Sequence, residues 1–255
     1  MSLFVGSSIA RLREPALPLL PEPVRACVFT GPSLDHETAR ALLPEAEIRP
    51  PIRRGDLPRA MAEGYRLFGI IDGTYIVEPT LAAPEVRDAV AQGAILFGAA
   101  SLGALRAVEF RIWGFQGIGV VYDWYLRGVT YRDDEVVAAM EPETFRALSE
   151  PLVNLRFACM RGLQAGVIGS ALVERLLERY AAYHFAERRF SRLFAAMRVE
   201  LAGDQLNQLE QLERFTAFVA EQGSALDIKR QDALRLIAVL RDGFVLTPRT
   251  APGPS

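Results

Sequence analysis

Two apolar runs that end at glycine-containing turns decide the fold of this chain: F-G-I-I-D-G at Phe68–Gly73 and A-I-L-F-G-A-A-S-L-G-A-L-R-A-V-E at Ala94–Glu109. Each run contains a stretch with the length of a buried strand, and a helix-like sequence follows it. A parallel strand that ends in a turn before a helix forms a crevice at the carboxyl edge of the sheet, where open α/β sheets bind ligands. The stretch therefore predicts a fold class and the position of a site.

The same alternation begins closer to the N-terminus. We expect strands at residues 26–30, 46–48, 67–71 and 94–98, and helices at residues 35–43, 57–64, 84–92 and 101–110. Asp35 and Asp56 are placed to cap two of these helices, and Pro84 suits a first helical turn. Repeated β-α units predict an α/β fold with a parallel, Rossmann-like sheet of about four strands, right-handed crossovers and flanking helices.

The character of the sequence changes after Trp113. Residues 117–127 are rich in aromatic side chains and indicate a helix, and Arg132 to Glu135 indicate the start of another. From Glu143 onward we expect only helices, at residues 143–166, 170–198, 204–222 and 227–242. The chain thus divides into an extended proline-rich arm (1–23), an α/β core (24–142), a helical region (143–246) and a disordered tail (247–255).

The composition is that of a globular protein without a strongly charged partner. The 29 basic and 31 acidic residues give a formal net charge of −2, so nothing favours nucleic acid, and no stretch is long and apolar enough for a membrane. Cys27 and Cys159 lie in apolar surroundings, which indicates buried thiols and a cytoplasmic protein. Lys229 is the only lysine, so arginines, which bind carboxylates bidentately, are the cations of interest.

Three turns are expected to meet at the carboxyl edge of the sheet. They are Gly31-Pro32-Ser33, Asp72-Gly73 and Gly98-Ala99-Ala100-Ser101. Ser33 and Ser101 would each lie at a helix N-terminus, where free N–H groups favour an anion. The alternative is that both serines are ordinary caps and that the small residues let a helix pack on the sheet. Asp72 is either a turn former or a carboxylate that orients water.

Further candidate residues carry charge or hydrogen-bonding groups within apolar helices. Arg106 and Glu109 share one helical face, either as a surface ion pair or as an arginine that receives an anionic tail. Asn154 and Arg156 are buried hydrogen-bond formers or the second region's contribution to the site. The acidic run Asp133-Asp134-Glu135 favours a helix start more than a metal site.

The chain shows no sign of a metal or nucleotide cofactor. His36 and His184 have no partner at metal-ligand spacing, and neither a P-loop, a G-x-G-x-x-G motif nor a G-x-S-x-G elbow is present. We therefore expect no cofactor.

Six linked motifs resemble the TfuA-like family. They are V-F-T-G-P-S-L (Val28–Leu34), P-P-I-R-R-G-D (Pro50–Asp56), G-I-I-D-G (Gly69–Gly73), F-G-A-A-S-L-G-A-L-R-A-V-E (Phe97–Glu109), D-D-E-V (Asp133–Val136) and L-S-E-P-L-V-N-L-R (Leu148–Arg156). Their order and spacing cover residues 26–168, and together they are specific, although none is so alone. The rest of the helical region carries no resemblance that we can name.

The resemblance implies sulfur delivery in peptide thioamidation. Such proteins are partners of YcaO enzymes, which use ATP to install thioamides in ribosomally made peptides. The implied activity is hydrolysis of a thiocarboxylated, ubiquitin-like sulfur carrier, with release of sulfide; the precursor peptide is a further possible partner. We expect the catalytic residues to be Ser33, Asp72, Ser101, Arg106 and Glu109, with Arg106 anchoring the carrier tail, and the substrate-binding residues to be Gly31, Pro32, Arg54, Gly73, Gly98, Ala99, Ala100, Asn154 and Arg156.

Two departures from the family pattern support an alternative function. The pattern has a His-Lys-Glu triplet where this chain has Ala83-Pro84-Glu85, and a histidine where it has Met140. If either histidine is a catalytic base, the chain either uses another base or is a non-catalytic adaptor or allosteric partner that recruits or stimulates a YcaO enzyme. A small-ligand α/β binder unrelated to sulfur is a third interpretation, supported by the fold class alone.

Overall fold

The computed structural model describes residues 23–74, 80–203 and 205–248, which form two compact units. Within the described chain, the α/β unit comprises residues 23–131, 142–146 and 229–248, and the helical unit comprises residues 132–141 and 147–228. The expected N-terminal arm, apart from Pro23, and residues 249–255 of the expected tail lie outside the described residues.

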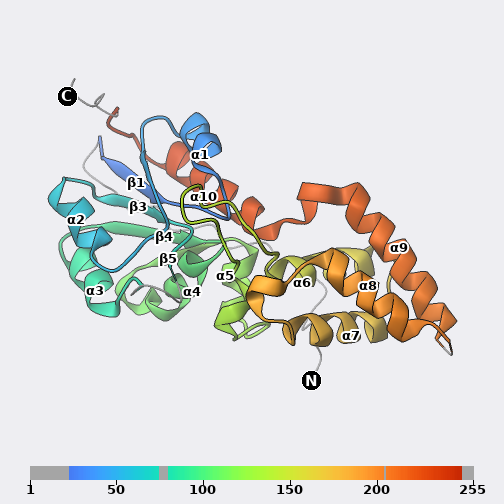
Figure 1. The fold of residues 1–255 in the computed structure, drawn as a ribbon. Coiled ribbons are helices and arrows are strands. Elements are labelled where there is room, and N and C mark those ends of the chain that lie inside the picture. The colour runs from blue at the N-terminus through green and yellow to red at the C-terminus, as the bar shows by residue number, and fades with distance from the viewer. Residues whose placement is uncertain (1–22, 75–79, 204, 249–255) are drawn as a thin grey trace. The chain divides into compact units, whose positions relative to one another are not determined.

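Five parallel strands form the sheet of the α/β unit in the order β2-β1-β3-β4-β5 (Figure 1). They are β1 (Ala26–Phe29), β2 (Glu47–Arg49), β3 (Leu67–Ile70), β4 (Ile95–Ala99) and β5 (Gln116–Ile118). The prediction of a parallel sheet is confirmed, and four strands lie where they were expected. The fifth was missed because Q-G-I is short and glycine-rich, and only the helix that follows it, α5 (Val120–Leu126), has a clear sequence signal.

Helices cover both faces of this sheet (Figure 1). Helices α1 (His36–Leu42) and α10 (Ile228–Gly243) share one core cluster with Val28, whereas α2 (Asp56–Ala62), α3 (Ala83–Ala91) and α4 (Leu102–Glu109) share the other with Phe29. Alternate side chains of β1 therefore enter opposite cores, which explains its continuous apolar sequence. Helix α10 belongs to this core: a Cβ atom on Gly69 of β3 would meet Leu236 Cδ2 at 2.7 Å.

The starts of α1 and α3 follow the sequence, whereas the start of α2 does not. Asp35 caps α1 by accepting a hydrogen bond from the Thr38 N–H, and Pro84 lies in the first turn of α3, both as predicted. Asp56 is not a cap. It is the first residue of α2, and Gly55 takes the cap position with φ +89°, where glycine avoids the strain that a side chain would add.

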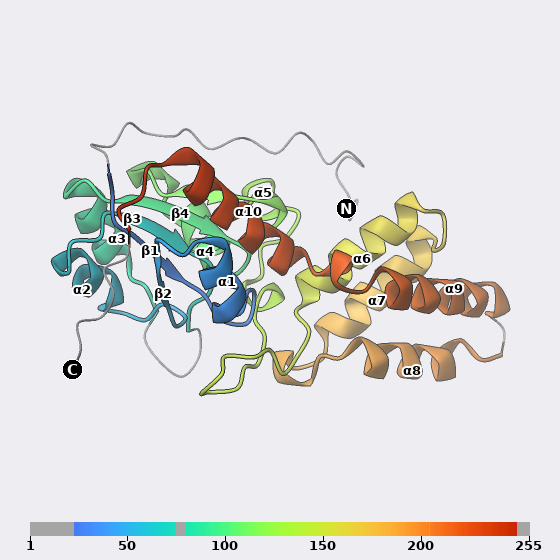
Figure 2. The same ribbon diagram turned by 90° about the horizontal axis from the view of Figure 1, so that it is seen from above.

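The helical unit contains α6 (Leu152–Gln164), α7 (Ser170–Ala181), α8 (Phe190–Leu201) and α9 (Leu206–Gln222), all seen in Figure 2. An aromatic chain joins three of them, with ring centroids 5.7 Å apart for Tyr180 and Phe190, and 5.8 Å apart for Phe194 and Phe215. On α9, Leu212 and Phe215 are fully buried.

Three helix predictions for this part of the chain were wrong. Residues 133–135 form a single 3-10 turn, and residues 143–151 are not helical. The expected helix at 170–198 breaks between α7 and α8, because the Arg188 side chain turns inward to bond to the carbonyl oxygens of Asp134 and Ala181. These contacts are tertiary, so local helix propensity could not report them.

Within the described residues, no helix combines the length and the apolar character that a membrane crossing requires.

Candidate functional site

The strand order reverses between β1 and β3. The chain adds β2 on one side of β1 and then builds β3, β4 and β5 on the other side. Doubly wound sheets bind ligands in the crevice that such a switch point creates at the carboxyl ends of the strands. The Gly31-Pro32-Ser33 turn follows β1 and Asp72 follows β3, so the structure places two of the candidate turns at this point.

Asp72 ties these two turns together. Its Oδ2 atom accepts hydrogen bonds from the backbone N–H groups of Gly31 and Ser33, both at 2.9 Å, and its Oδ1 atom accepts the Ser33 hydroxyl at 2.7 Å. Ser33 is 3% exposed and Asp72 is 2% exposed. The prediction that Ser33 opens a helix was wrong, because α1 begins at His36 and Asp35 is its cap. Ser33 instead presents its hydroxyl to a buried carboxylate.

Lys229 is the residue that the sequence interpretation missed. Its Nζ atom lies 3.9 Å from Asp72 Oδ1, and the side chain is 3% exposed. It comes from the first turn of α10, within a segment that the sequence assigned to the helical region. The available signal was its uniqueness, since every other basic side chain apart from the two histidines is arginine.

A second charged residue of α10 reaches the same edge of the sheet. Asp232 is fully buried and accepts the N–H groups of Val120 and Val121 at 2.9 and 2.8 Å, which caps α5. Burial raises the pKa of Asp232 to about 7, against the opposing effect of these two hydrogen bonds. The first turns of α10 therefore supply polar groups to two of the turns at the carboxyl edge.

The Pro50–Asp56 loop packs beside the Asp72 turn. The Ile52 N–H donates to the Asp72 carbonyl at 2.9 Å, and the Thr74 N–H donates to the Ile52 carbonyl at 3.1 Å. Glu85 holds the far end of the loop, because its carboxylate accepts the N–H groups of both Gly55 and Ala82. The glutamate that this chain shares with the family triplet thus has a structural partner. Arg54 is exposed on the loop.

The third candidate turn is filled by the protein's own backbone. A Cβ atom on Gly98 would meet the Gly103 carbonyl oxygen at 2.1 Å, and one on Gly103 would meet the Ile70 carbonyl oxygen at 1.7 Å. The small residues therefore let α4 pack on the sheet, as the alternative interpretation proposed. Ala100 has φ +64°, and Ser101 is buried at the cap position of α4 without a side-chain capping bond.

Gly73 and Pro32 complete this edge. A Cβ atom on Gly73 would lie 2.0 Å from Leu102 Cδ2, which joins the second turn to α4. Pro32 is partly buried between Gly31 and Ser33, and Ala99 ends β4 as a fully buried residue. The three turns are thus packed against one another. At Gly73, Gly98 and Gly103 the neighbouring atoms are too close to leave room for a ligand.

Arg106 and Glu109 form an ion pair with each other on α4. The Arg106 guanidinium also lies over the Phe110 ring, with its Cζ atom 5.7 Å from the ring centroid. Its side chain is 19% exposed and the Nε atom is buried without a hydrogen-bond partner. These contacts do not join Arg106 to Ser33 or Asp72.

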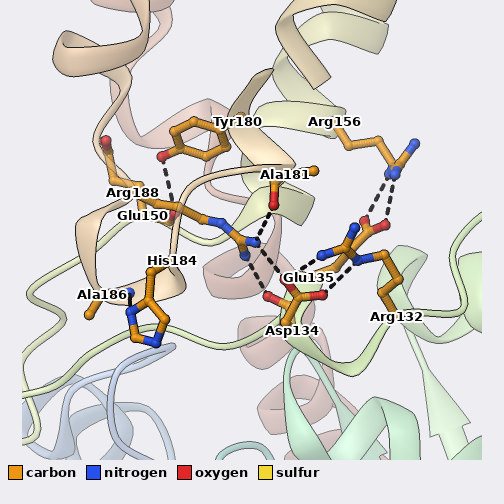
Figure 3. A network of polar contacts seen from close by, with 10 residues as sticks. All are labelled: Arg132, Asp134, Glu135, Glu150, Arg156, Tyr180, Ala181, His184, Ala186 and Arg188. Carbon is orange, nitrogen blue, oxygen red and sulfur yellow. Dashed lines mark hydrogen bonds and ion pairs between the residues drawn. The ribbon is translucent and has the colours of Figure 1, made fainter. Parts of the chain in front are cut away.

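Asn154 and Arg156 have partners inside the helical unit. Asn154 Nδ2 donates to Asp227 Oδ1 at 3.0 Å, and the Arg156 guanidinium donates to both carboxylate oxygens of Glu135, at 3.0 and 2.8 Å. Figure 3 shows this fork beside a second one, in which Arg132 grips Asp134. Arg156 and Glu135 are both buried, so the fork is a structural contact within the unit.

Asp134 and Glu135 of the acidic run therefore pair with arginines. Burial alone would raise the pKa of Asp134, but hydrogen bonds from Arg132 and Arg188 hold this pKa below its ordinary value. Glu150 lies in the same network, where it accepts the Phe190 N–H, and burial raises the pKa of its carboxyl group. In the part of the chain that the structure describes, no three His, Cys, Asp or Glu side chains are grouped to hold a metal.

A family model described as TfuA-like protein matches residues 72–189. The match confirms the resemblance that the motifs indicate and supports the assignment of the chain to the TfuA-like family. Because this family functions with YcaO-type proteins, the match suggests a role in the thioamidation system. It includes Asp72 and the arginine network of the helical unit, but neither Ser33 nor Lys229. No curated protein matches the chain significantly.

Proposed function

We propose that the α/β unit hydrolyses a thiocarboxylated, ubiquitin-like sulfur carrier and releases sulfide for a YcaO partner. The observation that carries this proposal is the Ser33 hydroxyl bonded to Asp72 at the switch point of the sheet. A hydroxyl with a carboxylate acceptor is the minimum needed for nucleophilic attack on an acyl group. The resemblance to the TfuA-like family is the reason for choosing this class of substrate.

The reaction follows from these two groups. Ser33 Oγ attacks the carbonyl carbon of the thiocarboxylate, and the hydroxyl proton passes to Asp72 Oδ1. The tetrahedral intermediate collapses as the C–S bond breaks, and the departing sulfur takes that proton and leaves as hydrosulfide. Water then hydrolyses the acyl-serine, which restores the hydroxyl and leaves the carrier with an ordinary carboxylate. Sulfide leaves readily, so a strong general acid is unnecessary.

The hydrogen bonds of Asp72 define what this carboxylate can do. Two backbone N–H groups and one hydroxyl donate to it, and Lys229 lies beside it. The main contribution of Asp72 is to hold the Gly31-Pro32-Ser33 turn and to orient the hydroxyl, with transient acceptance of the proton.

The test is to mix the purified full chain with the thiocarboxylated carrier and to follow sulfide and carrier mass together. We expect sulfide release and conversion of the carrier to its plain carboxylate, lost in Ser33→Ala and kept in Ser101→Ala. An unchanged carrier overturns the hydrolase proposal. Loss only in Ser101→Ala keeps the hydrolase and moves the nucleophile to Ser101.

Arg106 stays in the proposal as the group that receives the anionic tail. Its partner Glu109 is more exposed, at 36% against 19%, so a tail carboxylate could replace it without burying a new charge. We expect Arg106→Ala to weaken carrier binding. If both binding and sulfide release survive that change, Arg106 is a structural member of its ion pair and nothing more.

An adaptor function has one structural observation in its favour. Ser33 and Asp72 are almost completely buried, so a carrier tail must displace covering residues to reach them. A protein that only recruits or stimulates YcaO needs no such access. In this case the Ser33→Ala protein would bind YcaO in a pull-down and stimulate thioamidation as well as the unaltered chain, even with sulfide supplied.

A further inference from the structure

We propose that Lys229 supplies the positive charge of the reacting centre and faces the negative charge that develops on the thiocarboxylate during attack. The inference rests on the proposed function and adds a catalytic residue to it, from a helix outside the segment that the family model matches. No sequence motif pointed to it.

The first observation is that Lys229 and Ser33 meet at one atom. Asp72 Oδ1 accepts the Ser33 hydroxyl at 2.7 Å, and Lys229 Nζ lies 3.9 Å from the same oxygen. The other oxygen of this carboxylate receives the two backbone N–H groups of the turn. The hydroxyl and the ammonium group therefore share one side of Asp72, where an acyl group attacked by Ser33 would place its oxyanion.

The second observation is the length of the ion pair. A charge-assisted N–H···O bond is about 2.7–2.9 Å long, so 3.9 Å is a neighbouring charge and not a closed hydrogen bond. In the helical unit, by contrast, Arg156 closes both oxygens of Glu135 at 3.0 and 2.8 Å. Lys229 therefore adds charge beside Asp72 without forming the kind of fork that Arg156 forms on Glu135.

The third observation is the residue type. This chain uses arginine for all but one of its 29 basic residues, and the exception is the buried one beside Asp72. An arginine fork needs two acceptor oxygens, but the turn already occupies Oδ2 of Asp72. A lysine is a compact point charge on a flexible stem, which suits one oxygen and an oxyanion that forms and disappears.

The competing explanation is that Lys229 only neutralises a buried aspartate. A structural counter-ion would change folding stability on removal, whereas a catalytic cation also responds to the substrate's charge. The experiment must therefore observe the lysine itself and not stability alone.

The single lysine makes that observation direct. Growth with ¹⁵N,¹³C-lysine labels Lys229 alone, so the full chain gives one side-chain Cε and Nζ signal that needs no assignment. We expect this signal to shift on titration with N-acetylglycylglycine thiocarboxylate and to stay in place with the neutral N-acetylglycylglycinamide. A signal that does not move at saturating thiocarboxylated carrier overturns the inference, whether or not sulfide is released.

Kinetics supply the second test. Removal of one group that stabilises an oxyanion lowers kcat by about 10²-fold, and we expect this loss of sulfide release in Lys229→Met. Lys229→Arg keeps the charge and should recover part of kcat. Arg230→Met is the matched control, because it removes the next cation of α10, whose partner is Asp35 on α1. Full activity in Lys229→Met makes Lys229 a structural counter-ion.

The two proposals fail in different ways. Absence of sulfide release by the unaltered chain removes the hydrolase, and the lysine signal then still reports whether Lys229 meets an anionic tail. Sulfide release that persists in Lys229→Met, with an unmoved lysine signal, removes the inference and leaves the hydrolase in place.

Discussion

Asp72 in the α/β unit and Glu135 in the helical unit are both buried carboxylates, but they are held by different kinds of donor. Arg156 closes a planar fork on Glu135 and satisfies both oxygens at once. Asp72 instead receives two backbone N–H groups, one hydroxyl and a lysine at 3.9 Å. A fork fixes its carboxylate with one planar partner, whereas the separate groups around Asp72 include a hydroxyl and a neighbouring ammonium group.

This difference separates the candidate residues that we expect to take part in chemistry from those that we expect to stabilise the fold. The sequence offered Ser33, Asp72 and Arg156 as parts of one site, and the structure pairs Arg156 with Glu135 within the helical unit. Only the α/β unit places a hydroxyl against a carboxylate at a sheet switch point. Changes at Asp72 should therefore affect chemistry, and changes at Glu135 or Arg156 should affect stability.

The variants Asp72→Asn and Glu135→Gln test most directly whether Asp72 is catalytic and Glu135 structural. Each change keeps the shape and removes the charge. We expect Asp72→Asn to lower sulfide release by about 10⁴-fold, as when an orienting carboxylate becomes an amide in a hydrolytic triad. Glu135→Gln should leave the rate per folded molecule unchanged. If both variants lost sulfide release equally, the kind of donor around each carboxylate would not distinguish a catalytic residue from a structural one.

Arg156→Met should give the largest loss of stability. Removing one partner of a buried ion pair leaves an uncompensated charge and costs about 3–5 kcal/mol. Arg198 is the matched control, because it makes the same fork with Glu213 on the exposed surface of the helical unit. We expect a much smaller change in Arg198→Met. Chemical denaturation of both variants measures the difference, and similar values would contradict the burial argument.

Gly103→Ala and Gly162→Ala compare how the two units are packed. The added methyl group on Gly103 meets the Ile70 carbonyl oxygen at 1.7 Å, whereas on Gly162 it meets side-chain atoms of Ile168 and Phe215 at 2.9 Å. Backbone atoms cannot move aside, so we expect Gly103→Ala to cost about 3 kcal/mol or more. Gly162→Ala should cost less, because side-chain atoms can shift to make room for the methyl group. Thermal unfolding of the two variants ranks them, and the reverse order would be inconsistent with a backbone-packed site.

The last comparison concerns the pH dependence of the α/β unit. Burial raises the pKa of Asp232 from 3.8 to about 7, so the folded chain holds a proton that the unfolded chain has lost over this range. The contribution of Asp232 to the free energy of unfolding is therefore complete below pH 3.8 and declines as the pH rises toward 7. Asp232→Asn should flatten this slope in denaturation experiments between pH 4 and 8. An unchanged slope would mean that the two N–H bonds from α5 outweigh burial.

Much of the fold could be predicted from the sequence, because buried apolar residues recur with the period of a strand or a helix over short segments. Four strands, the Asp35 cap and the Pro84 helix start all have a signal within a few residues, and each lies where it was predicted. The strand β5 and the break after α7 had none. A three-residue strand with a central glycine lacks periodicity, and the α7–α8 break depends on Arg188 reaching Asp134.

The sequence by itself determined that strands and helices alternate, that polar turns follow β1 and β3, and which residue types those turns carry. Only the tertiary structure decided that Ser33 bonds to Asp72, that α4 fills the glycine turn, and that Lys229 returns to the site from the last helix. The physical reason is the distance along the chain over which each kind of interaction acts. Side-chain periodicity encodes local structure, whereas the partner of a buried charge is chosen by the packing of α10 on a sheet built from much earlier residues.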